Sequence, residues 1–76
     1  MKELLEYLAK SLVTHPDAVK VTETEREGRI TLRLEVAEED RGRVIGRSGK
    51  TAMAMRTLVG AVAAREGRSV SVEIAE

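Results

Sequence analysis

Residues 43–51, RVIGRSGKT, have the composition of a loop that binds phosphate. This stretch holds two glycines, Gly46 and Gly49, together with two arginines, a lysine and a serine. Because glycine has no Cβ, the main chain of such a loop can approach a phosphate closely, and the neighbouring cations supply the opposite charge. The phosphate could belong to a nucleotide held for hydrolysis, or to the backbone of a nucleic acid that is bound without reaction.

Two nucleotide-binding patterns can be tested against the glycine spacing. A P-loop needs G-x-x-x-x-G-K-[ST], of which Gly49-Lys50-Thr51 supplies only the end. The first glycine of that pattern would stand where the chain has Val44, and Gly46 comes two residues too late. A dinucleotide fingerprint fails as well, because Gly42, Gly46 and Gly49 are four and three residues apart rather than two and three. The spacing therefore argues against a nucleotide-hydrolysing loop.

The interpretation that remains is a G-x-x-G turn, Gly46 to Gly49, between two helices. A turn without Cβ atoms on its inside lets a sugar–phosphate backbone reach main-chain N–H groups. The start of the next helix adds unpaired N–H groups and the positive end of its dipole. Arg47 and Lys50 contribute charge, and Ser48 contributes a small hydrogen-bond donor. Since joints between helices often contain glycine, the prediction also depends on the flanking residues and on the charge distribution.

The chain is neutral as a whole, with 13 basic and 13 acidic residues, but the charges are unevenly placed. Residues 1–40 contain six basic and ten acidic side chains, whereas residues 41–76 contain seven basic and three acidic ones. A local basic segment on a neutral protein indicates a specific anion site rather than a nonspecific polycation. The segment has no acidic residue between its first and last cations, and its cations are Arg41, Arg43, Arg47, Lys50 and Arg56.

Before the basic segment, the hydrophobic pattern predicts a helix and a hairpin. Leucines at helical spacing predict a helix over about residues 2–14, which the His15-Pro16 pair ends. β-Branched residues predict a strand over about 18–26, and strict alternation from Ile30 to Val36 predicts a second strand with one buried face. Glu27-Gly28 lies between the strands and predicts a tight turn.

After the hairpin, residues 38–45 predict a short helix with acidic residues in its first turn, and residues 50–66 predict a longer helix that Gly67 ends. The alternating pattern at the end of the chain predicts a last strand. A helical crossover separates the second and third strands, so they can lie side by side in parallel. The expected fold is α+β in the order α-β-β-α-α-β, with a three-stranded mixed sheet, helices packed on one face, and a single domain over residues 1–76.

This element order and the stretch VIGRSGKTAMAMRTLV resemble the type II KH domain, whose GxxG loop clamps a nucleic-acid backbone. The resemblance covers essentially the whole chain, which is similar to the small bacterial single-KH RNA-binding proteins of the KhpA type, a family of RNA chaperones. It implies single-stranded RNA binding and post-transcriptional regulation. It also implies a homodimer, or a heterodimer with a larger KH-containing protein of the KhpB type that is linked to cell-wall biogenesis and cell shape.

The resemblance assigns the backbone clamp to the G-x-x-G turn. Since the chain has no Phe or Trp and only one Tyr, aromatic stacking of bases is not expected. We expect bases to rest on an aliphatic groove, with Val44 and Ile45 on one side and residues 34–36 of the second strand on the other. Ile45 is equally compatible with core packing. The expected RNA-binding residues are Arg43, Ile45, Gly46, Arg47, Ser48, Gly49, Lys50 and Arg56.

The helix predicted over residues 50–66 is apolar on two sides. One side is the predicted core stripe, formed at helical spacing by Met55, Leu58, Val59 and Val62. The other side has small residues that would let a second subunit approach closely, which predicts a dimer interface, although alanine and glycine are also tolerated at a surface. The candidate interface residues are Met53, Thr57, Gly60, Ala61 and Ala64.

The composition argues against several other classes of function. With no Cys and one His, a metal site is not expected, and no catalytic constellation is recognisable, so we expect no cofactor, no small-molecule substrate and no enzymatic activity. No apolar run approaches the roughly 20 residues of a membrane span, and the N-terminus carries acidic residues among its leucines, unlike a secretory signal peptide. We expect a cytoplasmic protein without a membrane partner. Two alternatives stay open: single-stranded DNA as the ligand, and a protein-interaction module with a vestigial loop.

Overall fold

The alternating residues that follow the first helix form a β-hairpin. In the computed structural model, which describes residues 1–76, β1 (Lys20–Arg26) pairs antiparallel with β2 (Arg29–Glu35). The turn residues Glu27 and Gly28 have φ values of 53° and 80°. Positive φ at both central positions characterises a type I′ turn, whose twist matches that of the flanking strands. The predicted tight hairpin is confirmed.

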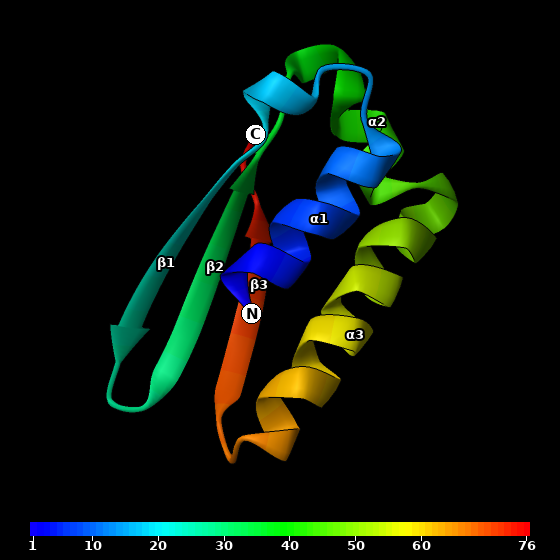
Figure 1. Ribbon diagram of the computed structural model, residues 1–76. Helices are drawn as coiled ribbons and strands as arrows, with labels where there is room; N and C mark the ends of the chain where they lie inside the picture. Colours follow the sequence, from blue (N-terminus) through cyan, green and yellow to red (C-terminus); the bar gives the residue numbers. More distant parts are fainter.

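The third strand extends the sheet in parallel. β2 pairs in parallel with β3 (Ser69–Ile74), and the strand order is β1-β2-β3. The crossover between β2 and β3 contains α2 (Arg41–Ile45) and α3 (Lys50–Arg65). Together with α1 (Lys2–Leu12), these helices lie on one side of the sheet (Figure 1). The predicted α+β fold, its element order and its mixed sheet are confirmed.

The core lies between the sheet and the helices. Alternate residues of β2 point into it, because successive side chains of a strand face opposite sides. Ile30, Leu32 and Leu34 are completely buried, whereas Arg29 and Arg33 on the other face are exposed. The remaining large core residues come from the neighbouring strands and from all three helices: Leu5, Val21, Val44, Met55, Val59 and Val72.

The first helix is shorter than predicted. It ends at Leu12 rather than at residue 14, and Val13 is extended, with φ −97° and ψ 162°. The backbone N–H groups of Thr14 and His15 donate to the Asp40 carboxylate instead of continuing the helix. A 3₁₀ turn over Pro16–Ala18 follows, so β1 begins at residue 20 rather than 18.

The predicted helix over residues 38–45 is two separate elements. Glu38–Asp40 forms a 3₁₀ turn, and α2 begins only at Arg41. The break falls at Asp40, whose side chain does not cap α2. Its carboxylate instead accepts hydrogen bonds from the segment after α1, which fixes the entry of the chain into α2.

The last helix ends as predicted but buries a different stripe. Gly67, with φ 70°, donates to the carbonyl of Ala64, while Arg68 donates to that of Ala63. This pair of bonds is a Schellman motif and confirms the glycine cap. The predicted core stripe is wrong at Leu58, which is 51% exposed, and Val62 is only half-buried. The buried residues of α3 are Ala52, Met55, Val59 and Ala63.

Ala52 and Ala63 explain why the buried stripe of α3 differs from the predicted one. Helix faces are set by position around the axis, and residues spaced three and four apart share a face whatever their size. Ala52 and Ala63 continue the face of Met55 and Val59 toward both ends, and their small side chains permit close packing against the sheet. Hydrophobicity alone favoured Leu58, which lies about 100° away from Val59 around the helix. No helix in the structure combines the length and apolarity needed to cross a membrane.

Candidate nucleic-acid interface

Gly46 holds a conformation that only glycine adopts readily. Its φ of 77° and ψ of 172° lie in a region that is essentially closed to residues with a side chain. The space beside it is also occupied: a Cβ added at Gly46 would lie 2.7 Å from the Cβ of Thr51 and 2.8 Å from its backbone nitrogen. Thr51 therefore packs against the bare main chain at the end of α2, and this contact sets the start of α3 against the loop.

The rest of the loop turns back through two left-handed residues. Ser48 has φ 55° and Gly49 has φ 75°, and the N–H of Gly49 donates to the carbonyl of Gly46 at 3.1 Å. A left-handed serine is uncommon and costs conformational energy, which marks this turn as a constrained one. Arg47 and Ser48 at its tip are exposed, and a Cβ added at Gly49 would meet nothing within 4 Å. One side of the loop is therefore open to a ligand.

The start of α3 makes the loop attractive to anions. Gly49 is the N-cap residue of α3, and no side chain accepts a hydrogen bond from the first-turn N–H groups. Such a helix end presents free donors and partial positive charge. Arg47 and Lys50 stand beside it, and the ion pairs of the structure involve neither of them. No protein carboxylate competes with a phosphate for these two cations.

A hollow of about 410 Å³ lies beside the loop, bounded by α2, the first half of α3 and the end of β3. Its apolar surface comes partly from Ile45, which is 40% exposed, and from Ala52 and Ile74. Its charged residues are Arg41, Arg56 and Glu76. The hollow thus has an aliphatic floor, two arginines and one glutamate at its border, and no aromatic side chain.

The predicted walls of this groove are partly wrong. Val44 is completely buried in the core, because Val44 and Ile45 are neighbours on a helix and point in different directions. Leu34 is also buried, since β2 is the central strand and its inner face is covered by helices. The second wall comes instead from β3, the edge strand next to α3, through Ile74 and the residues after it.

Two of the predicted basic residues are held by protein groups. The Nε of Arg43 lies 3.5 Å from Oδ1 of Asp40, and Arg43 does not line the hollow. The Nε of Arg56 donates to the carbonyl of Val72 at 3.2 Å, and Arg56 does line the hollow. Arg41, a member of the basic segment, borders the hollow from α2. The structure thus gathers Ile45, Gly49 and Arg56 around one hollow and leaves Arg43 outside it.

Comparison with known proteins identifies the family of this chain. The sequence matches the family model described as the KH domain of KhpA/KhpB over residues 2–74. The chain belongs to the KhpA/KhpB KH-domain family. The predicted resemblance to KhpA-type proteins with a type II KH domain is confirmed.

Relatives of the KhpA type match over nearly their whole length. RNA-binding protein KhpA of Clostridium acetobutylicum is 53% identical over 74 residues, which cover 97% of this chain and 99% of that protein. KhpA of Caldanaerobacter subterraneus subsp. tengcongensis is 50% identical with the same coverage. KhpA of Listeria monocytogenes is 43% identical over 76 residues, the whole of both chains.

A solved structure shows the same fold within a larger protein. Era of Aquifex aeolicus, bound to GDP and AlF4−, superposes with a TM-score of 0.63 over 96% of this chain. This chain spans only 28% of that Era chain, and the sequence identity is 18%. The likeness concerns the fold alone.

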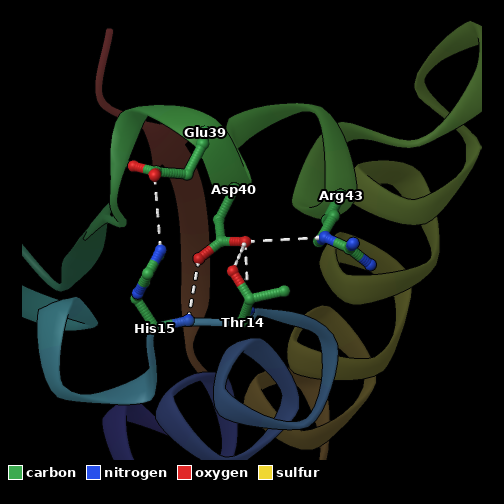
Figure 2. A network of polar contacts seen from close by, with 5 residues as sticks. All are labelled: Thr14, His15, Glu39, Asp40 and Arg43. Atoms are coloured by element: carbon green, nitrogen blue, oxygen red, sulfur yellow. Dashed lines mark hydrogen bonds and ion pairs between the residues drawn. The ribbon is translucent and has the colours of Figure 1, made fainter.

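In this KhpA/KhpB-family chain, one buried carboxylate anchors the helix that carries the loop. Both oxygens of Asp40 accept hydrogen bonds: Thr14 donates its N–H at 3.0 Å and its hydroxyl at 2.8 Å, and His15 donates its N–H at 3.0 Å (Figure 2). His15 also reaches Glu39, with 3.3 Å between Nε2 and Oε2. Asp40 immediately precedes α2, and Gly46 immediately follows it. The network therefore ties α1 to the helix that ends at the loop.

The environment of Asp40 favours its charged form. Burial alone would raise the pKa of this carboxyl, but the hydrogen bonds from Thr14 and His15 outweigh burial and lower the pKa below 3.8. In the sequence, Asp40 stands out only as an acidic residue in the first turn of the helix predicted over residues 38–45. Its partners are 25 and 26 residues away in the chain, so no local pattern could have identified them.

The side of α3 that points away from the sheet, here called its outer face, is not covered by any other part of this KH domain. It carries exposed residues between Met53 and Ala64. Met53 is 64% exposed, and Leu58 lies on the same helix at 51%. Among the predicted interface residues, only Gly60 is half-buried, while the others are exposed: Met53, Thr57, Ala61 and Ala64. Leu58, which the sequence pattern assigns to the core, adds a large apolar side chain to this helix surface.

Proposed function

We propose that this chain is a non-catalytic, single-stranded RNA-binding protein that holds the RNA backbone at the loop Gly46–Gly49. The observation that carries the proposal is the glycine-only conformation of Gly46 beside an uncapped helix start and two unpaired cations. The names of the KhpA relatives, RNA-binding proteins that match over essentially the full chain, support it.

The loop and the hollow divide the binding between them. Phosphates lie against the main chain of Gly46–Gly49, where Arg47 and Lys50 neutralise charge and Ser48 donates a hydrogen bond. Bases extend into the hollow against Ile45 and Ile74. Arg43 stands outside the hollow, with its side chain 58% exposed and its Nε 3.5 Å from Asp40, so it steers RNA toward the loop by its charge rather than through a phosphate contact.

The same geometry supports an RNA chaperone. Without aromatic stacking, each nucleotide contributes little binding energy, and a clamp on the backbone tolerates many sequences. Such a protein binds and releases RNA rapidly, which suits the remodelling of RNA in post-transcriptional regulation in the cytoplasm. A backbone clamp does not by itself read the 2′-hydroxyl, so single-stranded DNA of matched sequence belongs in the binding assays.

The loop assignment is tested by the double substitution Arg47→Asp and Ser48→Asp. Two charge-assisted contacts of about 1.5 kcal/mol each are lost, so affinity for a labelled RNA of about eight nucleotides falls at least about 100-fold. Fluorescence anisotropy measures the affinity, and circular dichroism checks the fold. The matched control is Arg65→Asp with Ser69→Asp, two exposed positions at the end of α3 and the start of β3, away from the loop. Parent-like RNA binding by the loop variant, with an intact fold, would show that the clamp is assigned wrongly.

We also propose that the outer face of α3 packs against a second copy of the chain. The exposed side chains of Met53 and Leu58 favour this surface, since a helix apolar on two sides is stabilised when both are covered. A family that contains both KhpA and KhpB suggests that the same face pairs with the KH domain of a larger, KhpB-type relative. If the face were the only functional surface, the chain would be a protein-interaction module and the double loop variant would leave its function intact.

A further inference from the structure

The groove beside the loop offers an unusual set of hydrogen-bonding side chains. The whole chain contains no Asn or Gln, so the paired amide contact by which proteins read adenine cannot form. No aromatic residue lines the hollow, and its charged groups are Arg41, Arg56 and Glu76. Any side-chain reading of bases in this hollow is therefore limited to two guanidinium groups and a carboxylate.

Arg56 is the better oriented of the two arginines. Its Nε donates to the carbonyl of Val72 at 3.2 Å in a partly buried contact. That bond ties the guanidinium to the edge of β3, which forms one wall of the hollow, and leaves both terminal nitrogens for other acceptors. Arg56 takes part in no ion pair. A planar guanidinium fixed in this way presents parallel N–H donors to any group that offers two neighbouring acceptors.

We infer that Arg56 makes this groove select cytosine or guanine over adenine and uracil, an inference that rests on the proposed RNA-binding function. Cytosine presents O2 and N3 as neighbouring acceptors, and guanine presents O6 and N7. Adenine has no two neighbouring acceptors, because a donor amine adjoins N1 and N7. In uracil a donor N–H separates the two carbonyls. All of these edges are accessible in a single strand.

Glu76, which also lines the hollow, is compatible with the same two bases. Glu76 is the acidic residue that lines the hollow, and its ionised carboxylate accepts hydrogen bonds only. Cytosine offers its exocyclic amine to such an acceptor, and guanine offers its own amine. Adenine and uracil also carry an N–H donor, in the exocyclic amine and at N3, so the discrimination against them comes from the guanidinium. Cytosine and guanine are therefore the bases that can satisfy both the guanidinium and the carboxylate.

The inference is tested with four labelled RNAs of about eight nucleotides: oligouridine, and the same strand with one central cytosine, guanine or adenine. We expect the cytosine or guanine strand to bind the parent protein about tenfold more tightly than the adenine strand. Arg56→Lys keeps the charge but loses the two parallel N–H donors of the guanidinium. The affinities for the cytosine or guanine strand and for the adenine strand should then become about equal, while the salt dependence of binding is unchanged. The matched control, Arg65→Lys, keeps the preference because Arg65 lies at the other end of α3.

The outcomes separate this inference from the proposed function. Equal affinity of the parent for all four RNAs overturns the base preference and leaves RNA binding in place. A preference that survives in Arg56→Lys overturns the role of Arg56. The absence of binding to every RNA overturns the proposed function and the inference with it.

Discussion

The two glycines of the loop have different structural roles, although the G-x-x-G pattern treats them alike. Gly46 needs both a glycine-only backbone conformation and the absence of a Cβ, because Thr51 occupies that space. Gly49 needs only its left-handed backbone, since nothing lies within 4 Å of an added Cβ. The contact between Gly46 and Thr51 holds the end of α2 against the start of α3.

This difference predicts unequal effects of alanine. Gly46→Ala combines backbone strain with overpacking and lowers the free energy of unfolding by about 3 kcal/mol, whereas Gly49→Ala lowers it by about 1 kcal/mol. Urea unfolding followed by circular dichroism measures both values. Thr51→Ala in the Gly46→Ala background recovers only part of the loss, because the backbone nitrogen of residue 51 remains in contact. Equal destabilisation by the two alanine substitutions would contradict the distinction.

The lowered pKa of Asp40 makes its contribution to stability dependent on pH. In the folded state this pKa lies below 3.8, so the folded protein binds fewer protons than the unfolded chain near that pH. Asp40 therefore stabilises the fold above about pH 4, and that stabilisation is lost as the pH falls through the lowered pKa. Asp40→Asn removes the charge and leaves the His15 N–H facing an amide donor or no partner.

We expect Asp40→Asn to lower the Tm clearly at neutral pH and the gap from the parent to shrink below about pH 4. Thermal unfolding measured by circular dichroism across this range gives the gap directly. Asp17→Asn, at an exposed carboxylate without a hydrogen-bond partner, is the control and should change Tm little at any pH. A gap for Asp40→Asn that stays constant as the pH falls would show that the charge of Asp40 is not the source of the stability.

Among the elements, α3 contributes residues to three different surfaces of the molecule. Its first turn borders the loop, its inner face packs on the sheet through Met55 and Val59, and its outer face carries Met53 and Leu58 into solvent. The outer face is separate from the residues that line the hollow. Pairing through it would therefore leave the loop of each copy open, and a dimer would present two RNA-binding sites.

The pairing of α3 is tested by Leu58→Glu with Ala61→Glu. Light scattering should give the mass of two chains for the parent and of one chain for the variant, because charges on a buried apolar face oppose association. RNA affinity per chain should stay within about threefold, and the circular dichroism spectrum should not change, since both residues are exposed in the single chain. A parent mass of one chain across a wide concentration range would contradict the dimer.

Predictability from the sequence also differs between elements. The hairpin could be predicted because Glu27-Gly28 and the alternation in β2 are local signals with a direct geometric meaning. Which side of α2 faces the core could not be predicted, because five residues are too few to show a helical period. The sequence therefore places Val44 in the groove, although it is a core residue. Asp40 was missed because its partners follow α1, and the β3 wall was missed because it exists only after the crossover packs.

At the scale of the whole molecule, a neutral protein carries a small basic site. The unpaired cations at the loop and the hollow are few, namely Arg41, Arg47 and Lys50. Binding to single-stranded RNA should therefore depend only moderately on salt. Each phosphate contact contributes about 0.7 to the slope, so log affinity should fall with log salt concentration with a slope of about −2.

Titrations at several salt concentrations measure this slope, and one substitution tests its origin. Lys50→Gln should reduce the slope by about 0.7, while Lys10→Gln on α1 should leave it unchanged. A slope steeper than about −5 in the parent would indicate a diffuse electrostatic surface rather than the loop site.

The parallel pairing of β2 with β3 has a consequence for the order in which the molecule assembles. Ile30 pairs with Val70 across a connection that contains α2 and α3, whereas the hairpin and the loop join near neighbours. Pairings between distant residues form late, because the entropy of closing the intervening chain must be overcome first. Gly46–Gly49 form from near neighbours, but the wall of the hollow at Ile74 exists only once β3 has docked. We expect selective RNA binding to begin only when the last strand docks.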